Sequence, residues 1–175
     1  YGGLYREVNF IEKNNIYISN PSIADIEAGG GVFITFPTVN EKMSEVKIQT
    51  HVINEGENDK GARIKHVIKK GNDIVEEVTA DIILRKGKQG NTWCYTVEMD
   101  SPALWSPDSP TLYTLETTIY DEDGMVMDRN TERFGIRKFE FKDNQLYING
   151  KKTYLRGVNR HQEYPYIGYA LSDNA

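Results

Sequence analysis

The sequence is poor in cysteine, with Cys94 as the one thiol among 175 residues. A single cysteine excludes an internal disulfide and any metal site built from several cysteines. Cys94 lies in a strand-like run, residues 92–97, and we expect a buried free thiol, because free cysteine packs like a small apolar side chain. No basic residue adjoins it in the sequence, so we predict no reactive role.

Long apolar runs are absent as well. No stretch approaches the ~18 apolar residues that a membrane-spanning helix needs, and no signal peptide is visible. The net charge is -5 and no stripe of basic residues stands out, so we expect neither a membrane nor a nucleic acid as partner. The chain begins at Tyr1 rather than Met, so we expect an excerpt or a processed product, and the compartment stays open between cytoplasm and periplasm.

Motifs that carry chemistry by themselves are also missing. The sequence has no G-x-S-x-G, no glycine-rich phosphate loop and no H-E-x-x-H. The acidic run at residues 121–123 lacks the alternating ligands and the distal Glu of a calcium loop, and is predicted to be a solvated turn. His51 and His66 lie in predicted strands without a partner at ligand spacing. We therefore predict surface positions for both, with no metal or catalytic role.

What the sequence does have is a series of short alternating segments between turn signals. Hydrophobic residues make up 38% of the chain and aromatic residues 11%, as is usual for a folded β protein. Strands are predicted over residues 32–36, 46–53, 62–68, 73–78, 81–84, 93–99, 112–120 and 125–134. This regular spacing, with no segment of helical period, predicts an all-β fold, an immunoglobulin-like β-sandwich. The paired cysteines of antibody domains are absent, so the prediction concerns architecture only.

Short strands also flank the predicted sandwich. Residues 4–11 and 16–18 are predicted strands with too little around them for a core, and we expect them to belong to a preceding domain. Three short strands follow the sandwich, at residues 139–141, 146–148 and 153–155, separated by polar turns of which the second begins with Asn-Gly. The stretch 134–161 is therefore predicted to join the sandwich to a second domain.

The candidate site is the loop at the end of the last predicted strand, Arg-Gly-Val-Asn-Arg-His at residues 156–161. Guanidinium, amide and imidazole groups at a strand's C-terminal end suit the binding of hydroxyls and anions. A solvated loop of charged residues explains the same sequence. The sequence alone therefore leaves open whether this loop is a binding site or a solvated loop.

Several further segments carry a resemblance. The chain has GGLYREV at residues 2–8, LWSPDSPTLY at 104–113, FGIR at 134–137, LYINGK at 146–151 and RGVNRH at 156–161. Together and in this order they resemble signature segments of family-2 glycoside hydrolases, and RGVNRH resembles the form seen in β-galactosidases rather than β-glucuronidases.

The resemblance implies a layout of three parts. Residues 1–20 would end a sugar-binding jelly roll, residues 21–137 would form the immunoglobulin-like domain, and residues 138–175 would start a catalytic (β/α)8 barrel. It implies a fragment of a retaining exo-glycosidase that hydrolyses terminal β-D-galactosides by means of two carboxylates. Both would be glutamates beyond Ala175, so no catalytic residue is expected in this chain and the fragment alone is expected to be inactive.

The resemblance also implies binding residues. His161, Asn159 and Arg160 would line the sugar pocket, because their N–H groups can bind sugar hydroxyls. Gln162 departs from the Glu that β-galactosidases often carry there, which leaves the exact sugar open. The full-length enzyme would bind Mg²⁺ and Na⁺ through ligands largely outside this segment and could form a homo-oligomer. The alternative is a free-standing β-sandwich that binds carbohydrate or another protein.

Overall fold

The computed structural model describes residues 8–160 and 163–170. They fall into two compact units, residues 13–153 and a second unit made of residues up to 12 and from 154 onward. Nearly all regular structure is strand, and the helix α1 (Pro21–Ala24) has four residues. Among the described residues, no helix has the length and apolar character that crossing a membrane requires.

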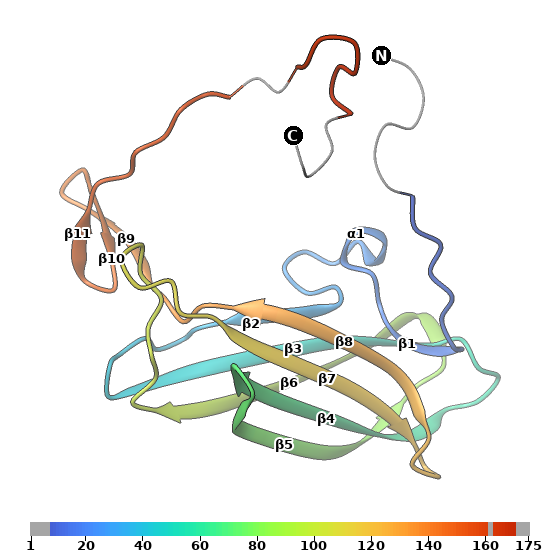
Figure 1. Ribbon diagram of the computed structural model, residues 1–175. Coiled ribbons are helices and arrows are strands. Elements are labelled where there is room, and N and C mark those ends of the chain that lie inside the picture. The colour runs from blue at the N-terminus through green and yellow to red at the C-terminus, as the bar shows by residue number, and fades with distance from the viewer. Residues whose placement is uncertain (1–7, 161–162, 171–175) are drawn as a thin grey trace. The chain divides into compact units, whose positions relative to one another are not determined.

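The first sheet is built around β3 (Met43–Asn54). β6 (Gly87–Asp100) pairs along one side of it. On the other side, β2 (Val32–Thr35) pairs with its middle and β1 (Ile16–Ile18) with its last three residues. All of these pairings are antiparallel, so β3 forms the centre of this layer (Figure 1).

The second sheet has the strand order β5-β4-β7-β8. Its members are β4 (Lys60–Lys70), β5 (Asp73–Leu84), β7 (Tyr113–Asp121) and β8 (Val126–Phe134). The chain changes sheet between β3 and β4, between β5 and β6, and again between β6 and β7. Two antiparallel sheets connected in this way form an immunoglobulin-like β-sandwich, so the predicted fold class is confirmed.

Strand boundaries differ from the prediction in several places: β6 begins at Gly87 rather than at residue 93, and β11 spans Lys151–Thr153 rather than residues 153–155. β5 is one continuous strand, where we predicted a break between residues 78 and 81. Thr79 and Ala80 pair directly with Lys65 and Ile64 of β4, and this ladder carries the strand across two residues whose own signal is weak. Residues 8–11, the described part of the first predicted strand, are not in a strand.

The interior of the sandwich holds two apolar clusters. The first gathers around Ile48, Leu115 and Phe134, and the second around Val52, Ile64 and Ile119. On each of three strands one buried polar residue stands between the two clusters. These residues, which we call the polar layer, are Thr50 on β3, His66 on β4 and Thr117 on β7.

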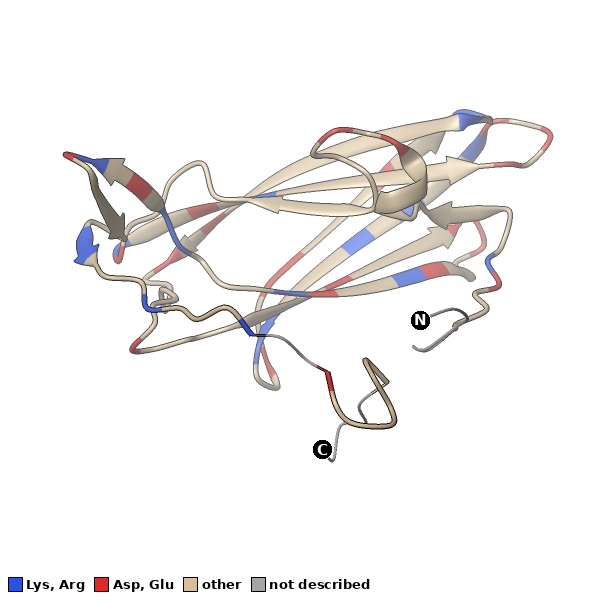
Figure 2. Ribbon diagram, turned by 90° about the horizontal axis from the view of Figure 1, so that it is seen from above, with Lys and Arg blue, Asp and Glu red and all other residues tan. Residues whose placement is uncertain are grey.

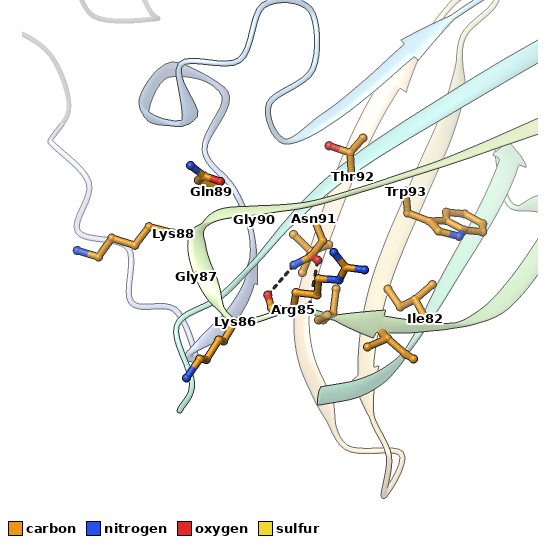
Figure 3. A pocket seen from close by; sticks show the side chains of 13 residues that line it. Ile82, Arg85, Lys86, Gly87, Lys88, Gln89, Gly90, Asn91, Thr92 and Trp93 are labelled. Atoms are coloured by element: carbon orange, nitrogen blue, oxygen red, sulfur yellow. Dashed lines mark hydrogen bonds between the residues drawn. The ribbon is translucent and has the colours of Figure 1, made fainter. Parts of the chain in front are cut away.

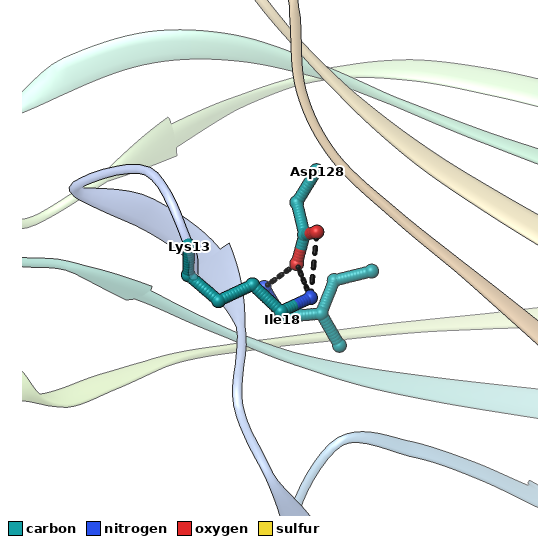
Figure 4. Close-up of polar contacts among 3 residues, drawn as sticks. All are labelled: Lys13, Ile18 and Asp128. Carbon is teal, nitrogen blue, oxygen red and sulfur yellow. Dashed lines mark hydrogen bonds and ion pairs between the residues drawn. The ribbon is translucent and has the colours of Figure 1, made fainter. Parts of the chain in front are cut away.

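β1 is placed differently from our expectation. We expected residues 16–18 to belong with a preceding domain, but Ile16 and Ile18 are 3% exposed and pack into the second apolar cluster. Asp128 of β8 fastens this strand to the opposite sheet (Figure 4). One of its oxygens accepts the Ile18 backbone N–H at 2.8 Å, and Lys13 Nζ lies 2.7 Å from the other. The assignment of the residues before β1 to a jelly roll stays a prediction.

Charged residues of both signs are spread along the strands of the sandwich (Figure 2). On the second sheet, three ion pairs join neighbouring strands: Arg63–Asp81, Lys65–Glu77 and Lys69–Glu116. Cross-strand pairs of opposite charge favour the observed register, although exposed pairs contribute little free energy.

A small third sheet stands at one end of the sandwich (Figure 1). It consists of β9 (Phe139–Lys142), β10 (Gln145–Ile148) and β11 (Lys151–Thr153), all antiparallel. Both connecting turns have two residues with positive φ, Asp143-Asn144 and Asn149-Gly150. Two-residue turns of this type match the twist of a hairpin, so the polar turns predicted between these strands are confirmed.

Candidate functional site

The predicted sugar-binding loop follows the third sheet closely. β11 ends at Thr153, and Arg156, Asn159 and Arg160 follow in a segment without regular structure. All three are exposed, as is Val158 between them. His161 lies outside the described residues, and so does Gln162. The exposed groups offer guanidinium and amide donors of the kind that bind hydroxyls and carboxylates.

The next described residues, 163–170, form a compact turn. The backbone N–H of Tyr164 donates to the Gly168 carbonyl at 3.1 Å, and the Gly168 N–H donates back to Tyr164 at 2.9 Å. The hydroxyl of Tyr169 donates to the carboxylate of Glu163 at 2.7 Å. These contacts lie within the turn itself.

The segment that leads out of the sandwich is fastened to the loop around Trp105. Ile136 is fully buried, and its carbonyl accepts the Trp105 backbone N–H at 2.9 Å. Gly135 lies against the indole side chain, where an added Cβ would come within 2.8 Å of the Trp105 Cβ. Two resemblance segments that are distant in sequence, residues 104–113 and 134–137, therefore meet in space.

Arg137 continues this contact. Its guanidinium carbon lies 4.8 Å from the centre of the Trp105 ring and 5.4 Å from the centre of the Phe139 ring. A cation over an aromatic face is attracted by the ring quadrupole. Arg137 thus links the sandwich loop to the first strand of the third sheet.

Asn149 completes the arrangement from the hairpin side. Its side-chain Nδ2 donates to the Trp105 carbonyl at 2.9 Å, and its Oδ1 accepts the Lys138 backbone N–H at 2.9 Å. Its own backbone N–H donates to the Lys138 carbonyl at 2.9 Å. We call Trp105, residues 135–138 and Asn149 the joint. The sequence predicted a join in this stretch and an Asn-Gly turn, but not the polar contacts that hold it.

His51 is not the surface residue that we predicted. It points to the outer face of the first sheet as expected, but it is 2% exposed because the segment leading from β1 to β2 covers that face. Its Nε2 lies 2.8 Å from the Gln89 carbonyl, which can only accept, so Nε2 carries the proton. Nδ1 then accepts the hydroxyl of Ser19 at 2.8 Å. Ser19 is 3% exposed, so this Ser–His pair is closed to substrate and serves packing.

The prediction for His66 is wrong as well. It is 1% exposed in the polar layer, since β4 turns this position inward despite its lysine neighbours. Nδ1 pairs with the Thr117 hydroxyl at 3.0 Å, and the ring stacks on Trp93 at 5.6 Å. Burial lowers the pKa of His66 from 6.5 to about 4, so the ring is neutral at neutral pH. The alternation of residues 62–68 was the signal that could have revealed this inward position.

Cys94 differs from its prediction in the opposite direction. The thiol is exposed, and Sγ lies 3.7 Å from the amide oxygen of Gln49. It sits on the outer face of β6, while Trp93 and Val97 point inward. The apolar character of cysteine therefore led to the wrong prediction for Cys94. The alternation of side chains along β6 places Cys94 on the outer face.

A hollow of about 490 Å³ lies beside the turn between β5 and β6 (Figure 3). Both ends of the Asn91 amide are bonded to the backbone of Arg85, at 2.9 and 3.0 Å. Trp93 already stacks with His66 and Tyr95. Asn91 holds the turn itself, and we assign this hollow no ligand.

Comparison with known families now places the chain. Residues 25–137 match glycosyl hydrolases family 2, and residues 139–175 match the TIM barrel domain of the same family. The chain belongs to glycosyl hydrolases family 2. The resemblance seen in the sequence is confirmed, and Lys138 in the joint is the one residue between the two matched segments.

Relatives within glycosyl hydrolases family 2 carry more than one activity. The β-galactosidase of Thermoanaerobacter pseudethanolicus is 32% identical over 174 residues, covering 99% of this chain and 21% of that protein. The β-galactosidase of Thermoanaerobacterium thermosulfurigenes is 29% identical, covering 98% and 22%. The crystal structure of Bacteroides uniformis β-glucuronidase superposes with a TM-score of 0.74 at 28% identity, covering 91% and 19%. The chain spans about a fifth of the length of these relatives.

Proposed function

We propose that this chain is part of a retaining exo-glycosidase that hydrolyses terminal β-D-galactosides. In this proposal the residues before β1 end a preceding jelly roll, β1 and residues 21–137 belong to a structural sandwich, and residues 138–175 begin the catalytic barrel. The observation that carries it is the exposed segment 156–160 directly after β11, within the residues that match the barrel domain. β-Galactosidases at 32% and 29% identity across almost the whole chain support this substrate class.

Within this proposal the chain contributes binding and not bond cleavage. Asn159 and Arg160 donate hydrogen bonds to sugar hydroxyls, together with His161. A retaining mechanism needs two carboxylates about 5–5.5 Å apart, one as acid/base and one as nucleophile. These belong to the rest of the protein, so the chain alone is expected to be inactive.

Metal ions stay outside the proposed steps. The described residues bring together no group of three or more His, Cys, Asp and Glu side chains that could hold a metal ion. Binding of Mg²⁺ and Na⁺ by the full-length protein and homo-oligomer formation stay predictions.

The test begins with the full-length protein encoded by the gene from which this sequence comes. Its kcat/KM is measured with p-nitrophenyl β-D-galactoside and with the corresponding glucuronide. We expect the galactoside to be preferred by at least ~100-fold, since a site built to bind one polar group rejects an analogue that lacks it. A preference for the glucuronide would move the assignment to β-glucuronidase, and activity on neither would contradict the proposal.

Point variants of the same protein test the binding residues. Asn159→Ala and Arg160→Ala are expected to lower kcat/KM about tenfold or more, the loss expected when a charged or strongly polar contact to substrate is removed. Lys152→Ala is the matched control, because Lys152 is an exposed cation on β11, a few residues earlier. Equal effects of all three variants would count against a role of this loop in binding.

A further inference from the structure

We propose that Asn149 is a positioning residue. Through Trp105 and Lys138 it fixes the third sheet on the sandwich, and with it the end of β11, from which the chain continues to the segment 156–160. This inference rests on the function proposed above for that segment.

The first argument is the number of segments that meet at one side chain. Asn149 bonds to the carbonyl of Trp105 in the sandwich loop and to both backbone groups of Lys138, each at 2.9 Å. A carboxamide has one oxygen and one NH₂ group, and here each is used on a different segment. No aliphatic residue could hold these two backbones together.

The second argument is that the backbone connecting the sandwich to the third sheet is held in place at Lys138. Lys138 is the residue between the two matched segments, and both its N–H and its carbonyl are held by Asn149. Two residues before it, Ile136 is fully buried, and Asn149 itself follows directly on Ile148, which is 3% exposed. A hinge needs residues that are free to change φ and ψ, and this border lacks them.

The third argument is the short path from the joint to the proposed binding segment. Asn149 opens the two-residue turn into β11, which ends at Thr153, and Arg156 follows after two further residues. Holding the strand at its first turn fixes the position of its last residue, Thr153, from which the chain continues. A displacement of about 1 Å at a reacting group can cost as much as ~100-fold in rate, so such support matters even when it is far from the chemistry.

The chain offers a matched control in Asn144. Asn144 and Asn149 both have positive φ, 56° and 51°, in the two hairpin turns of the same small sheet. The Asn144 side chain is exposed and makes no hydrogen bond within the part of the chain that the structure describes. Replacing either residue by Gly keeps the turn conformation. The Asn149→Gly variant alone removes the side-chain bonds to the Trp105 carbonyl and the Lys138 N–H, while the backbone bond to the Lys138 carbonyl remains possible.

A third variant separates the two contacts. In Asn149→Asp the carboxylate can still accept the Lys138 N–H, but it cannot donate to the Trp105 carbonyl. If the link to the sandwich is what positions the sheet, Asn149→Asp should behave like Asn149→Gly. If it behaves like the unchanged protein, Trp105 is not the partner that matters and the inference is overturned.

The experiment measures hydrogen exchange and steady-state kinetics on the full-length protein. In Asn149→Gly, exchange over residues 136–150 is expected to be about five- to thirtyfold faster, as for the loss of one to two ordinary hydrogen bonds. KM for the p-nitrophenyl galactoside is expected to rise about tenfold at an unchanged concentration of active sites, determined by titration. Asn144→Gly should change neither quantity.

These readouts distinguish failure of the inference from failure of the proposed function. An unstable protein would lose active sites, while a misplaced binding segment raises KM with the active sites intact. If the unchanged protein cleaves no glycoside, the proposed function fails. For such an inactive protein, unchanged hydrogen exchange in Asn149→Gly would overturn the inference separately. For an active enzyme, an unchanged KM in Asn149→Gly would overturn it.

Discussion

The interior of the sandwich and the joint are held together by different kinds of contact. Nineteen buried hydrophobic residues form the core of the described chain, and almost all of them lie in the strands of the sandwich. In the joint, Ile136 is buried as well, but the contacts that fix direction are polar: the Asn149 amide, the Trp105 carbonyl and the Arg137 guanidinium. Apolar contacts tolerate exchange among similar side chains, whereas hydrogen bonds at 2.9 Å require particular atoms at particular places.

This difference explains where the family signatures lie. The segments LWSPDSPTLY, FGIR and LYINGK all contribute to the joint, while residues 32–100 supply most of the sandwich with little signature beyond their alternation. A pattern of apolar residues suffices to specify a buried strand face. The joint needs a Gly against an indole, an Arg over its ring and an Asn with positive φ, and few other residues serve.

Truncation inside the core should have the largest effect. Ile48→Ala removes a fully buried side chain from the first apolar cluster, and we expect a loss of about 4 kcal/mol in the free energy of unfolding. The control is Phe141→Ala in the third sheet, where the ring is 83% exposed in this chain and a change below ~0.5 kcal/mol is expected. Urea unfolding of the 175-residue chain measures both. Similar losses for the two variants would erase the distinction between the regions.

Acid should weaken the sandwich through its polar layer. Burial lowers the pKa of His66 to about 4 from 6.5, so between these two values the unfolded chain binds a proton that the folded chain does not. Stability should therefore fall as the pH drops from about 6.5 to 4, by up to about 3 kcal/mol at 1.36 kcal/mol per pKa unit. Below pH 4 the folded state also takes up the proton and this contribution levels off.

The variant His66→Gln isolates this titration. Unfolding free energies at pH 4.5 and pH 7 are compared for the unchanged chain and the variant, which share every other ionisable group. The variant should show the smaller pH dependence. Equal slopes would mean that His66 is not the group responsible.

Asp128 differs from the apolar contacts that dominate the sandwich, because it holds β1 by directed polar bonds, as Asn149 holds the joint. Asp128→Ala leaves the Ile18 N–H without its acceptor and removes the partner of Lys13, and we expect a loss of about 2 kcal/mol. Asp128→Asn keeps an acceptor and should cost less. Asp108→Ala serves as control, since both side chains of the Lys151–Asp108 pair are at least 80% exposed and such pairs contribute little. Thermal unfolding ranks the three variants by their loss of stability. A loss at Asp108 as large as at Asp128 would contradict the expectation that the buried polar contacts stabilise more than the exposed pair.

How much the sequence could predict follows the same division. Alternation predicted the sandwich strands, and the Asn-Gly dipeptide predicted the second turn of the third sheet, because both depend on local sequence and backbone conformation. Alternation correctly predicted that His51 points to the outer face of its sheet, but it did not predict burial. The His51 side chain is buried because the segment between β1 and β2 lies over it. Local periodicity does not indicate which distant segments come into contact. For the same reason the partners of Asn149 could not be predicted.

The smallest expected effect lies in the joint itself. Arg137→Met keeps a long apolar side chain over Trp105 and Phe139 but removes the cation, and we expect a loss of about 0.5–1 kcal/mol. Hydrogen exchange over residues 135–142 should rise accordingly while the sandwich strands stay protected, since no core contact changes. Arg133→Met is the control, because Arg133 is exposed on β8 four residues earlier, and it should leave exchange unchanged. If Arg137→Met instead loosened the sandwich strands, the joint and the core would form one cooperative unit and the separation drawn between them would not hold.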